Sequence, residues 1–144
     1  MTQMTTFERD RMLALEGEMR LSPMQLDLPV THYFGHNSYV RQMFAPAGTV
    51  AVGKIHKFAQ VNILLQGEMT VMTHRGLLRI VAPYVFEAPP GAKRAAYFHK
   101  DTVWLTVHGT DKVNIDELED ELIAKSFEEF DALCVDKQLS LELV

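Results

Sequence analysis

The stretch "GKIHKFAQVNILLQG", residues 53–67, decides the fold that the sequence predicts. It holds a histidine, a glutamine four residues later and a glycine seven residues beyond that, all within an apolar run. Because side chains alternate between the two faces of a strand, Lys54 and His56 share one face, and Gln60 and Asn62 share one face of the next strand. The stretch therefore predicts two short strands that each direct polar side chains to one side.

The flanking sequence, from Leu28 to about Thr110, has the same texture. Runs such as "TVAVGKIHK", "YVFEA" and "TVWLTVHG" are rich in β-branched and aromatic residues, and turn-forming residues separate the runs at 46–48, 66–67 and 89–91. Many short strands at even spacing are typical of a sandwich or a small barrel. We predict a mainly β chain.

Both ends of the chain carry helix signals. Thr5 and Glu8 have the spacing of a capping box, and Asn114 precedes a segment whose apolar residues recur on one face. The segment "SFEEFDALC" predicts a further helix. We expect one domain in three parts: a helical arm over residues 1–24, a β-barrel over 25–112 and C-terminal helices over 113–144.

Composition and charge exclude several classes of function. With 144 residues, a net charge of −5 and 47% hydrophobic residues, the chain has the composition of one globular domain, without the basic surface of a general nucleic-acid binder. The single cysteine, Cys134, excludes a disulfide within the chain and a thiolate metal cluster. Charged residues at the N-terminus and the lack of a long apolar run predict a soluble, cytoplasmic protein without membrane contact.

The glycine, proline and histidine spacing over residues 48–110 resembles the two motifs of the cupin superfamily. Gly53, His56 and Gly67 match the first motif, in which Lys54 stands at the first histidine position and Gln60 at the glutamate; Pro89 and Gly91 match the second, in which Arg94 replaces the last histidine. The resemblance implies a single RmlC-like jelly-roll barrel with an N-terminal helix and C-terminal helical segments. It also implies pairing into a homodimer.

The whole chain is also similar to small cupin-like proteins encoded by tailed bacteriophages. The similarity includes "NILLQG", "HKDTVWLTVHGTD" and "ELIAKS" and so extends beyond the barrel toward both ends. It implies a phage origin and a place in the host cell cytoplasm, but no biochemical role is carried over with it. Phage proteins of this size often act against host defences or on host nucleotide pools, which favours such a role.

The residues at the motif positions argue against a metal. A typical cupin site needs three imidazoles and a carboxylate, or two imidazoles and a carboxylate. Only His56 remains at these positions, with His99 or His108 as possible substitutes, and Lys54 and Arg94 add cations that would repel a divalent ion. We therefore predict no metal and no other cofactor. Two cations, one titratable base and the amides of Gln60 and Asn62 suit an anion with hydrogen-bonding edges.

A second candidate stretch is "HKDTVWLTVHG", residues 99–109. Alternation puts Trp104 and His108 on one face, with Thr106 between them, and Val103, Leu105 and Val107 on the other face, which we expect to be the core. The first face is then either a pocket wall or a covered surface. If it is accessible, Trp104 and His108 extend the ligand site. His32 and His36 line either a mouth or a subunit contact, and Lys93 fits an ordinary loop charge better than Arg94 does.

Assembly is predicted from the strand over residues 60–66. Val61, Ile63 and Leu65 form an apolar face opposite Gln60 and Asn62, so both faces need cover. The terminal helices or a second barrel could provide that cover, and we expect a homodimer.

Three functions follow. The first is a metal-free protein that binds a small anionic ligand, such as a nucleotide or a nucleotide signal, and sequesters it against host defence. The second is a metal-independent enzyme for phosphodiester cleavage or sugar epimerisation, with His56 and either His99 or His108 as acid and base. The third is a structural or host-protein interaction module that works through acidic helices around 116–121 and 128–131. Whether the chain is an enzyme stays open, with binding favoured.

Overall fold

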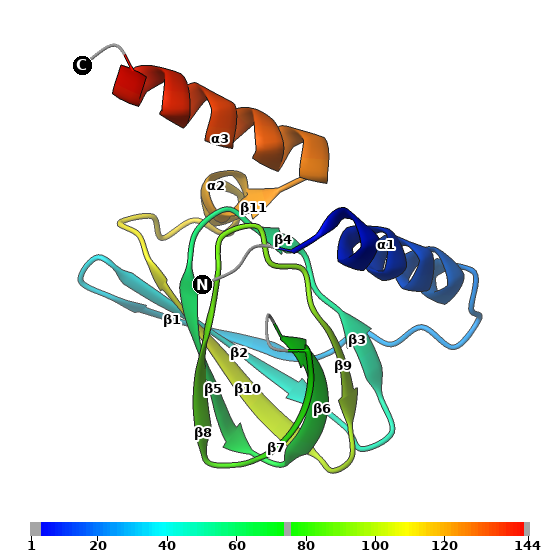
Figure 1. Ribbon diagram of the computed structural model, residues 1–144. Coiled ribbons are helices and arrows are strands. Elements are labelled where there is room, and N and C mark those ends of the chain that lie inside the picture. Colours follow the sequence, from blue (N-terminus) through cyan, green and yellow to red (C-terminus); the bar gives the residue numbers. More distant parts are fainter. Residues whose placement is uncertain (1–3, 74–75, 143–144) are drawn as a thin grey trace.

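The computed structural model describes residues 4–73 and 76–142, so the first three residues of the expected arm and the last two of the C-terminal segment lie outside it. Three helices and eleven strands form the described part, which Figure 1 shows. The elements in chain order are α1 (Thr6–Arg20), β1 (Val30–Gly35), β2 (Ser38–Ala45), β3 (Val50–Val52), β4 (Ile55–His56), β5 (Gln60–Gln66), β6 (Glu68–Thr73), β7 (Gly76–Val81), β8 (Tyr84–Ala88), β9 (Ala95–Phe98), β10 (Thr102–Gly109), α2 (Ile115–Leu122), β11 (Ile123–Ala124) and α3 (Phe127–Glu142).

The strands form two larger antiparallel sheets and one small one. The five-stranded sheet has the order β1-β2-β10-β5-β8, the four-stranded sheet has the order β3-β9-β6-β7, and β11 pairs with β4. Strands distant in sequence, such as β2 and β10, are hydrogen-bonded neighbours, as in a jelly roll. The prediction of a mainly β chain with helices at both ends is confirmed.

Two glycines at predicted turns are required by their surroundings. Gly67, between β5 and β6, has a φ of 101°, and a Cβ there would lie 2.6 Å from the Asp101 carbonyl oxygen. Gly91, before β9, has a φ of 81°, and a Cβ there would lie 2.6 Å from the ring of Phe130 in α3. These two glycines let the chain turn and let neighbouring segments approach closely.

An apolar core holds the two larger sheets together away from the helices. It consists of Ala45 and Leu64 from the five-stranded sheet and Met69, Val71, Ile80, Ala96 and Phe98 from the four-stranded sheet. Trp104 packs against this cluster from β10. Burying each large apolar side chain stabilises the fold by about 1.5–3 kcal/mol. The polar residues of the same strands are therefore fixed on a rigid base.

The prediction that Val103, Leu105 and Val107 form the core was wrong. They lie on the outer face of the five-stranded sheet, and the Trp104 face of β10 points to the interior. The helices leave that outer face open, because α1 packs against β3 while α2 and α3 pack against β11 (Figure 1). Leu65 and Val85 there are 56% and 63% exposed. Hydrophobicity marked the wrong face because the interior contains a polar cavity.

Charged residues attach α1 to the rest of the molecule. Thr5 and Glu8 form the predicted capping box. The Arg9 guanidinium donates two hydrogen bonds, of 2.8 and 3.0 Å, to the carboxylate of Asp131 in α3.

Lys93 provides a second attachment and corrects the prediction of a loop charge. It is only 6% exposed, and its Nζ donates to Glu16 of α1 at 2.7 Å and to the Gly53 carbonyl at 2.9 Å. A cation this deeply buried needs such partners.

No helix in the described part of the chain is long and apolar enough to cross a membrane.

Candidate functional site

A cavity of about 1000 Å³ is lined by the inner face of the five-stranded sheet. Its wall comes from alternate residues of β2, β5 and β10, and the residues around it include parts of α1, the segment 22–28 and α2. Its polar or aromatic lining includes His32, Tyr39, Arg41, Lys54, His56, Gln60, Asn62, Arg94, Trp104, Thr106 and His108, and Glu16, Arg20, Ser22, Gln25, Thr49 and Glu119 lie around it. A concave site that collects polar groups from several strands is the usual form of a small-molecule site.

Strand register explains why these residues meet. One row of paired residues crosses all five strands of the sheet, in the order Phe86, Asn62, Thr106, Arg41 and His32. Residues two positions away along each strand share the same face. Alternation predicted that Gln60 and Asn62 share one face of β5, and both side chains are buried in the structure.

Asn62 is the central polar group of the floor. It is 1% exposed, and its Oδ1 accepts hydrogen bonds from Trp104 Nε1 at 3.0 Å and from Thr106 Oγ1 at 3.3 Å. Its Nδ2 is buried and has no partner among the residues that the structure describes, and the same holds for Gln60 Oε1. A buried donor and a buried acceptor are thus left for something other than these protein groups.

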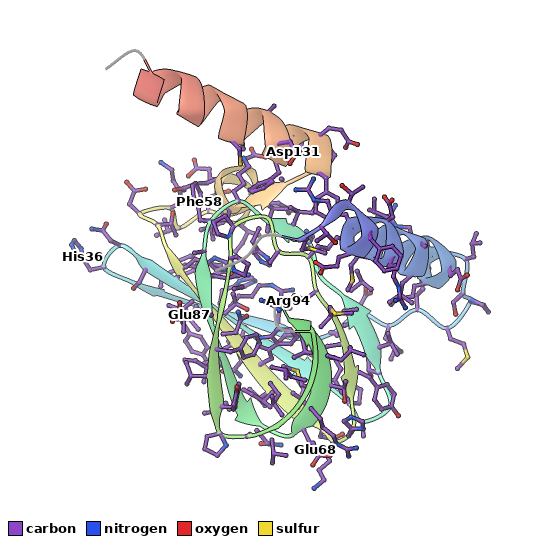
Figure 2. The ribbon with its side chains drawn as sticks, in the orientation of Figure 1. His36, Phe58, Glu68, Glu87, Arg94 and Asp131 are labelled. Carbon is purple, nitrogen blue, oxygen red and sulfur yellow. The ribbon has the colours of Figure 1, made fainter. Side chains whose placement is uncertain are left out.

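Arg94 is the buried cation of the cavity. It is 9% exposed, and Figure 2 shows it between the two sheets. Its Nη1 donates to the Met72 carbonyl at 2.8 Å, and its guanidinium carbon lies 5.4 Å from the centre of the Phe86 ring. Nε and Nη2 are buried without a partner in the described chain. Burial lowers the pKa of Arg94 to about 10, so the group is a cation at neutral pH.

A stack of rings forms one side of the site. The His56 ring lies 5.6 Å from His108, and His108 lies 5.7 Å from Tyr39, with interplanar angles of 24° and 16°. Tyr39 Oη is 2.6 Å from His32 Nδ1. Burial first, and then the charge of Arg41, lowers the pKa of His108 to about 4.

The pKa of His56 is lowered further, to about 3. Burial is the largest cause, followed by the neighbouring His108 and Arg41, with Arg94 a smaller one; a backbone hydrogen bond at Ala92 acts in the opposite direction. Both imidazoles are therefore neutral at pH 7. Neutral imidazoles can donate and accept hydrogen bonds, and they present flat faces to a ligand.

The structure brings most of the predicted site residues together. His56, Gln60, Asn62, Arg94, Trp104 and His108 all line the cavity. Lys54 lies at its edge, is exposed and forms an ion pair with Glu119 of α2. His99 does not join them, because its Nε2 is hydrogen-bonded to Thr70 Oγ1 at 2.7 Å and its ring contacts Tyr97. Of the two acid–base pairs considered, only His56 and His108 are neighbours.

Two lining residues, Tyr39 and Arg41, were not predicted from the sequence. Alternation along "SYVRQMFA" does put them on one face, together with Met43. Which face points inward depends on the pairing of β2 with β10, more than fifty residues away. Alternation alone therefore identified which residues share a face of the strand, but not whether that face points into the molecule.

The residues at the cupin motif positions do not fit a metal. Lys54 is paired with Glu119, Gln60 replaces a carboxylate, and Arg94 places a cation in the cavity. Residues 4–73 and 76–142 contain no group of three or more histidine, cysteine, aspartate or glutamate side chains that could hold a metal ion.

Solved cupin structures share this fold. A cupin superfamily protein of Desulfitobacterium hafniense DCB-2 is 12% identical, with a TM-score of 0.51 over 63% of this chain and 84% of its own. An RmlC-like cupin of Shewanella frigidimarina NCIMB 400 is 17% identical, with a TM-score of 0.53 over 67% and 86%. KdgF of a Halomonas species is 13% identical, with a TM-score of 0.54 over 67% and 90%.

These neighbours establish the cupin jelly-roll fold and nothing finer, because the sequence identities are low. No family model matches the chain, and no curated protein does. The fold alone hosts both binding proteins and enzymes, so the function has to be argued from the site.

Proposed function

We propose that this cupin-fold chain binds a small anionic organic ligand in its cavity without the help of a metal. One observation carries the proposal: Arg94 is buried as a cation, and two of its nitrogen atoms, Nε and Nη2, have no partner in the described chain. A buried charge left in this state is costly, and an anion that accepts both hydrogen bonds removes the cost.

The other predicted residues have roles around this charge. Asn62 and Gln60 orient the ligand through their free amide atoms, and His56 and His108 provide a neutral ring wall. Trp104 closes the floor, fixed by its bond to Asn62. Lys54 is bound to Glu119 at the edge and guides anions toward the cavity only when that pair opens.

A nucleotide or nucleotide signal is one ligand class within this proposal, since it combines an anion with a flat ring that could stack in the cavity. A small organic acid is the other class. Sequestering such a ligand against host defence would require affinity and no turnover, as expected for a phage protein. A homodimer, with one cavity in each copy, is part of the same proposal.

An enzyme is the second candidate, and the contact between His56 and His108 is the observation in its favour. Because their pKa values are about 3 and 4, both rings are neutral at pH 7 and can accept a proton as general bases. Neither carries the second ring proton that a general acid would transfer to a substrate. General base catalysis is therefore compatible with the site, whereas a pair of acid and base is not. No described contact favours the interaction-module alternative.

Titration of the protein with nucleotides, nucleotide sugars and organic acids tests the proposal, with Trp104 fluorescence and calorimetry as readouts. We expect saturable binding to the wild type and loss of that binding in Arg94→Gln. The matched control is Arg79→Gln, because Arg79 is exposed on β7 and pairs with Glu68 outside the cavity. Binding that survives Arg94→Gln would contradict the proposal, and turnover of any compound would establish the enzyme instead.

A further inference from the structure

We infer that the group bound by Arg94 is a carboxylate, and that the carbon next to it carries a hydroxyl read by Asn62 and Gln60. This inference rests on the proposed function and narrows it to hydroxy carboxylic acids. It follows from which atoms of three buried side chains are already occupied and which are left free.

The first step concerns the edge that Arg94 presents. A guanidinium can hold two oxygens along its Nη1–Nη2 tip or along its Nε–Nη2 side, and one of the two nitrogens of the tip, Nη1, already donates to the Met72 carbonyl. The free atoms, Nε and Nη2, form the other edge, so their N–H groups point in parallel to the same side. A planar carboxylate accepts two parallel N–H bonds in this arrangement.

The second step concerns the charge of the ligand. His56 and His108 are neutral at pH 7, and Lys54 is neutralised by Glu119. Arg94 is therefore the buried cation available, while Arg41, which also lines the cavity, is exposed, so its charge is screened by solvent. A carboxylate, with one negative charge, balances Arg94, whereas a phosphate dianion would leave one charge uncompensated in a poorly solvated site.

The third step concerns the two free amide atoms. The Arg94 guanidinium lies over the ring of Phe86 in β8, and Phe86 is paired with Asn62 in the neighbouring strand β5. The Arg94 guanidinium and the Asn62 amide therefore lie above adjacent positions on the inner face of the sheet. Asn62 Nδ2 needs an acceptor, and Gln60 Oε1, two residues away on the same face, needs a donor. A hydroxyl is the simplest group that accepts one hydrogen bond and donates another.

Four probes separate these steps: acetate, glycolate, inorganic phosphate and adenosine monophosphate. Each is titrated into ¹⁵N-labelled protein at pH 7, and the arginine Nε–H cross-peak that Arg94→Lys removes is followed. We expect acetate to shift this cross-peak saturably and glycolate to bind about fivefold more tightly through its hydroxyl. Phosphate and the nucleotide should bind at least about tenfold more weakly than glycolate.

Two variants complete the test. Arg94→Lys keeps the charge but loses the two-donor edge, so glycolate binding measured by calorimetry should weaken at least about tenfold. Gln60→Met removes the free acceptor at similar size and should reduce the preference for glycolate over acetate without abolishing carboxylate binding. Arg79→Lys is the control and should leave both values unchanged. Backbone spectra of every variant establish that it is folded.

The outcomes distinguish the inference from the proposal beneath it. Saturation by phosphate or the nucleotide, with no response to acetate or glycolate, keeps the anion site and overturns the carboxylate. Equal affinity for acetate and glycolate overturns the hydroxyl. If no probe shifts the Arg94 cross-peak, and neither these probes nor the wider ligand panel binds, the anion site itself is wrong.

Discussion

His56 of β4 and His108 of β10 stack in the cavity with their ring centroids 5.6 Å apart. The two strands belong to different sheets, so the contact joins the small β4–β11 sheet to the large five-stranded one. Protonating either ring would bring a cation beside Arg41 and, for His56, beside Arg94. The stack is therefore stable only while both imidazoles are neutral.

The first prediction is a loss of stability in acid. The ordinary pKa of both histidines is 6.5, and in the folded protein it falls to about 3 for His56 and about 4 for His108. The unfolded chain therefore binds these protons at higher pH than the folded chain. Stability is complete above pH 6.5 and falls as the pH drops toward 4 and then 3, by about 2 kcal/mol or more.

Urea unfolding from pH 7.5 to 3.5 measures this dependence. His108→Phe keeps a ring for Tyr39 and His56 and removes one proton site, so its free energy of unfolding should vary less with pH. His36→Asn is the control, since His36 lies exposed at the β1–β2 hairpin (Figure 2) and should leave the wild-type profile unchanged. Identical slopes for the wild type and His108→Phe would contradict the account.

The second prediction concerns the acceptor that Trp104 and Thr106 share. Asn62→Ala removes the oxygen that binds both side chains and takes the acceptor away from the part-buried indole N–H of Trp104. We expect a loss of about 1–3 kcal/mol in the free energy of unfolding and a shift in Trp104 emission. Gln66→Ala, at the exposed end of β5, should change neither by more than about 0.5 kcal/mol. A neutral effect of Asn62→Ala would show that the bond does not hold the floor.

The third prediction concerns Lys93, which joins α1 to the strands. Lys93→Ala removes the shorter of the two ion pairs of Glu16, leaving the one to Arg20 at 3.5 Å, and removes the bond to the Gly53 carbonyl. We expect a loss of about 2–3 kcal/mol in the free energy of unfolding. Relative to the wild type, amide hydrogen exchange should become faster in α1 by more than it does in β10. Lys125→Ala, at an exposed position whose side chain forms no ion pair with the described residues, is the matched control. Unchanged exchange in α1 would mean that Lys93 does not attach the helix.

The fourth prediction concerns the apolar outer face of the five-stranded sheet, on which we propose that two copies pair. Leu65 and Val85 are 56% and 63% exposed within the described part of the chain. Light scattering after size exclusion should give a dimer for the wild type and a monomer for Val85→Lys. Leu77→Lys, at an exposed position of the other sheet, should stay dimeric. A wild-type monomer would remove the dimer from the proposal.

The sequence predicted the elements of the site better than their direction. Alternation alone placed Gln60 and Asn62 together, and Gly67 and Gly91 lie at turns as expected. The prediction of which face of β10 points inward was wrong, because a face rich in valine and leucine usually packs in the core. In this fold the polar face of β10 lines the cavity, and its apolar face lies on the outer surface of the sheet.

Other features depended on pairings that no local pattern contains. Arg41 enters the cavity because β2 is hydrogen-bonded to β10, and Lys93 is buried because α1 supplies Glu16 from far away in the chain. His99 was a candidate acid–base partner of His56, but it follows β9, which belongs to the four-stranded sheet. Register between distant strands decides such cases, and alternation does not determine it.

Native mass spectrometry of the gently purified protein, compared with its denatured mass, tests the central claim most directly. Wild type and Arg94→Lys are measured side by side. The account predicts a small organic, non-metal adduct on the wild type that is absent from the variant. A stoichiometric divalent metal on the wild type, or the same bare mass for both proteins, would contradict it.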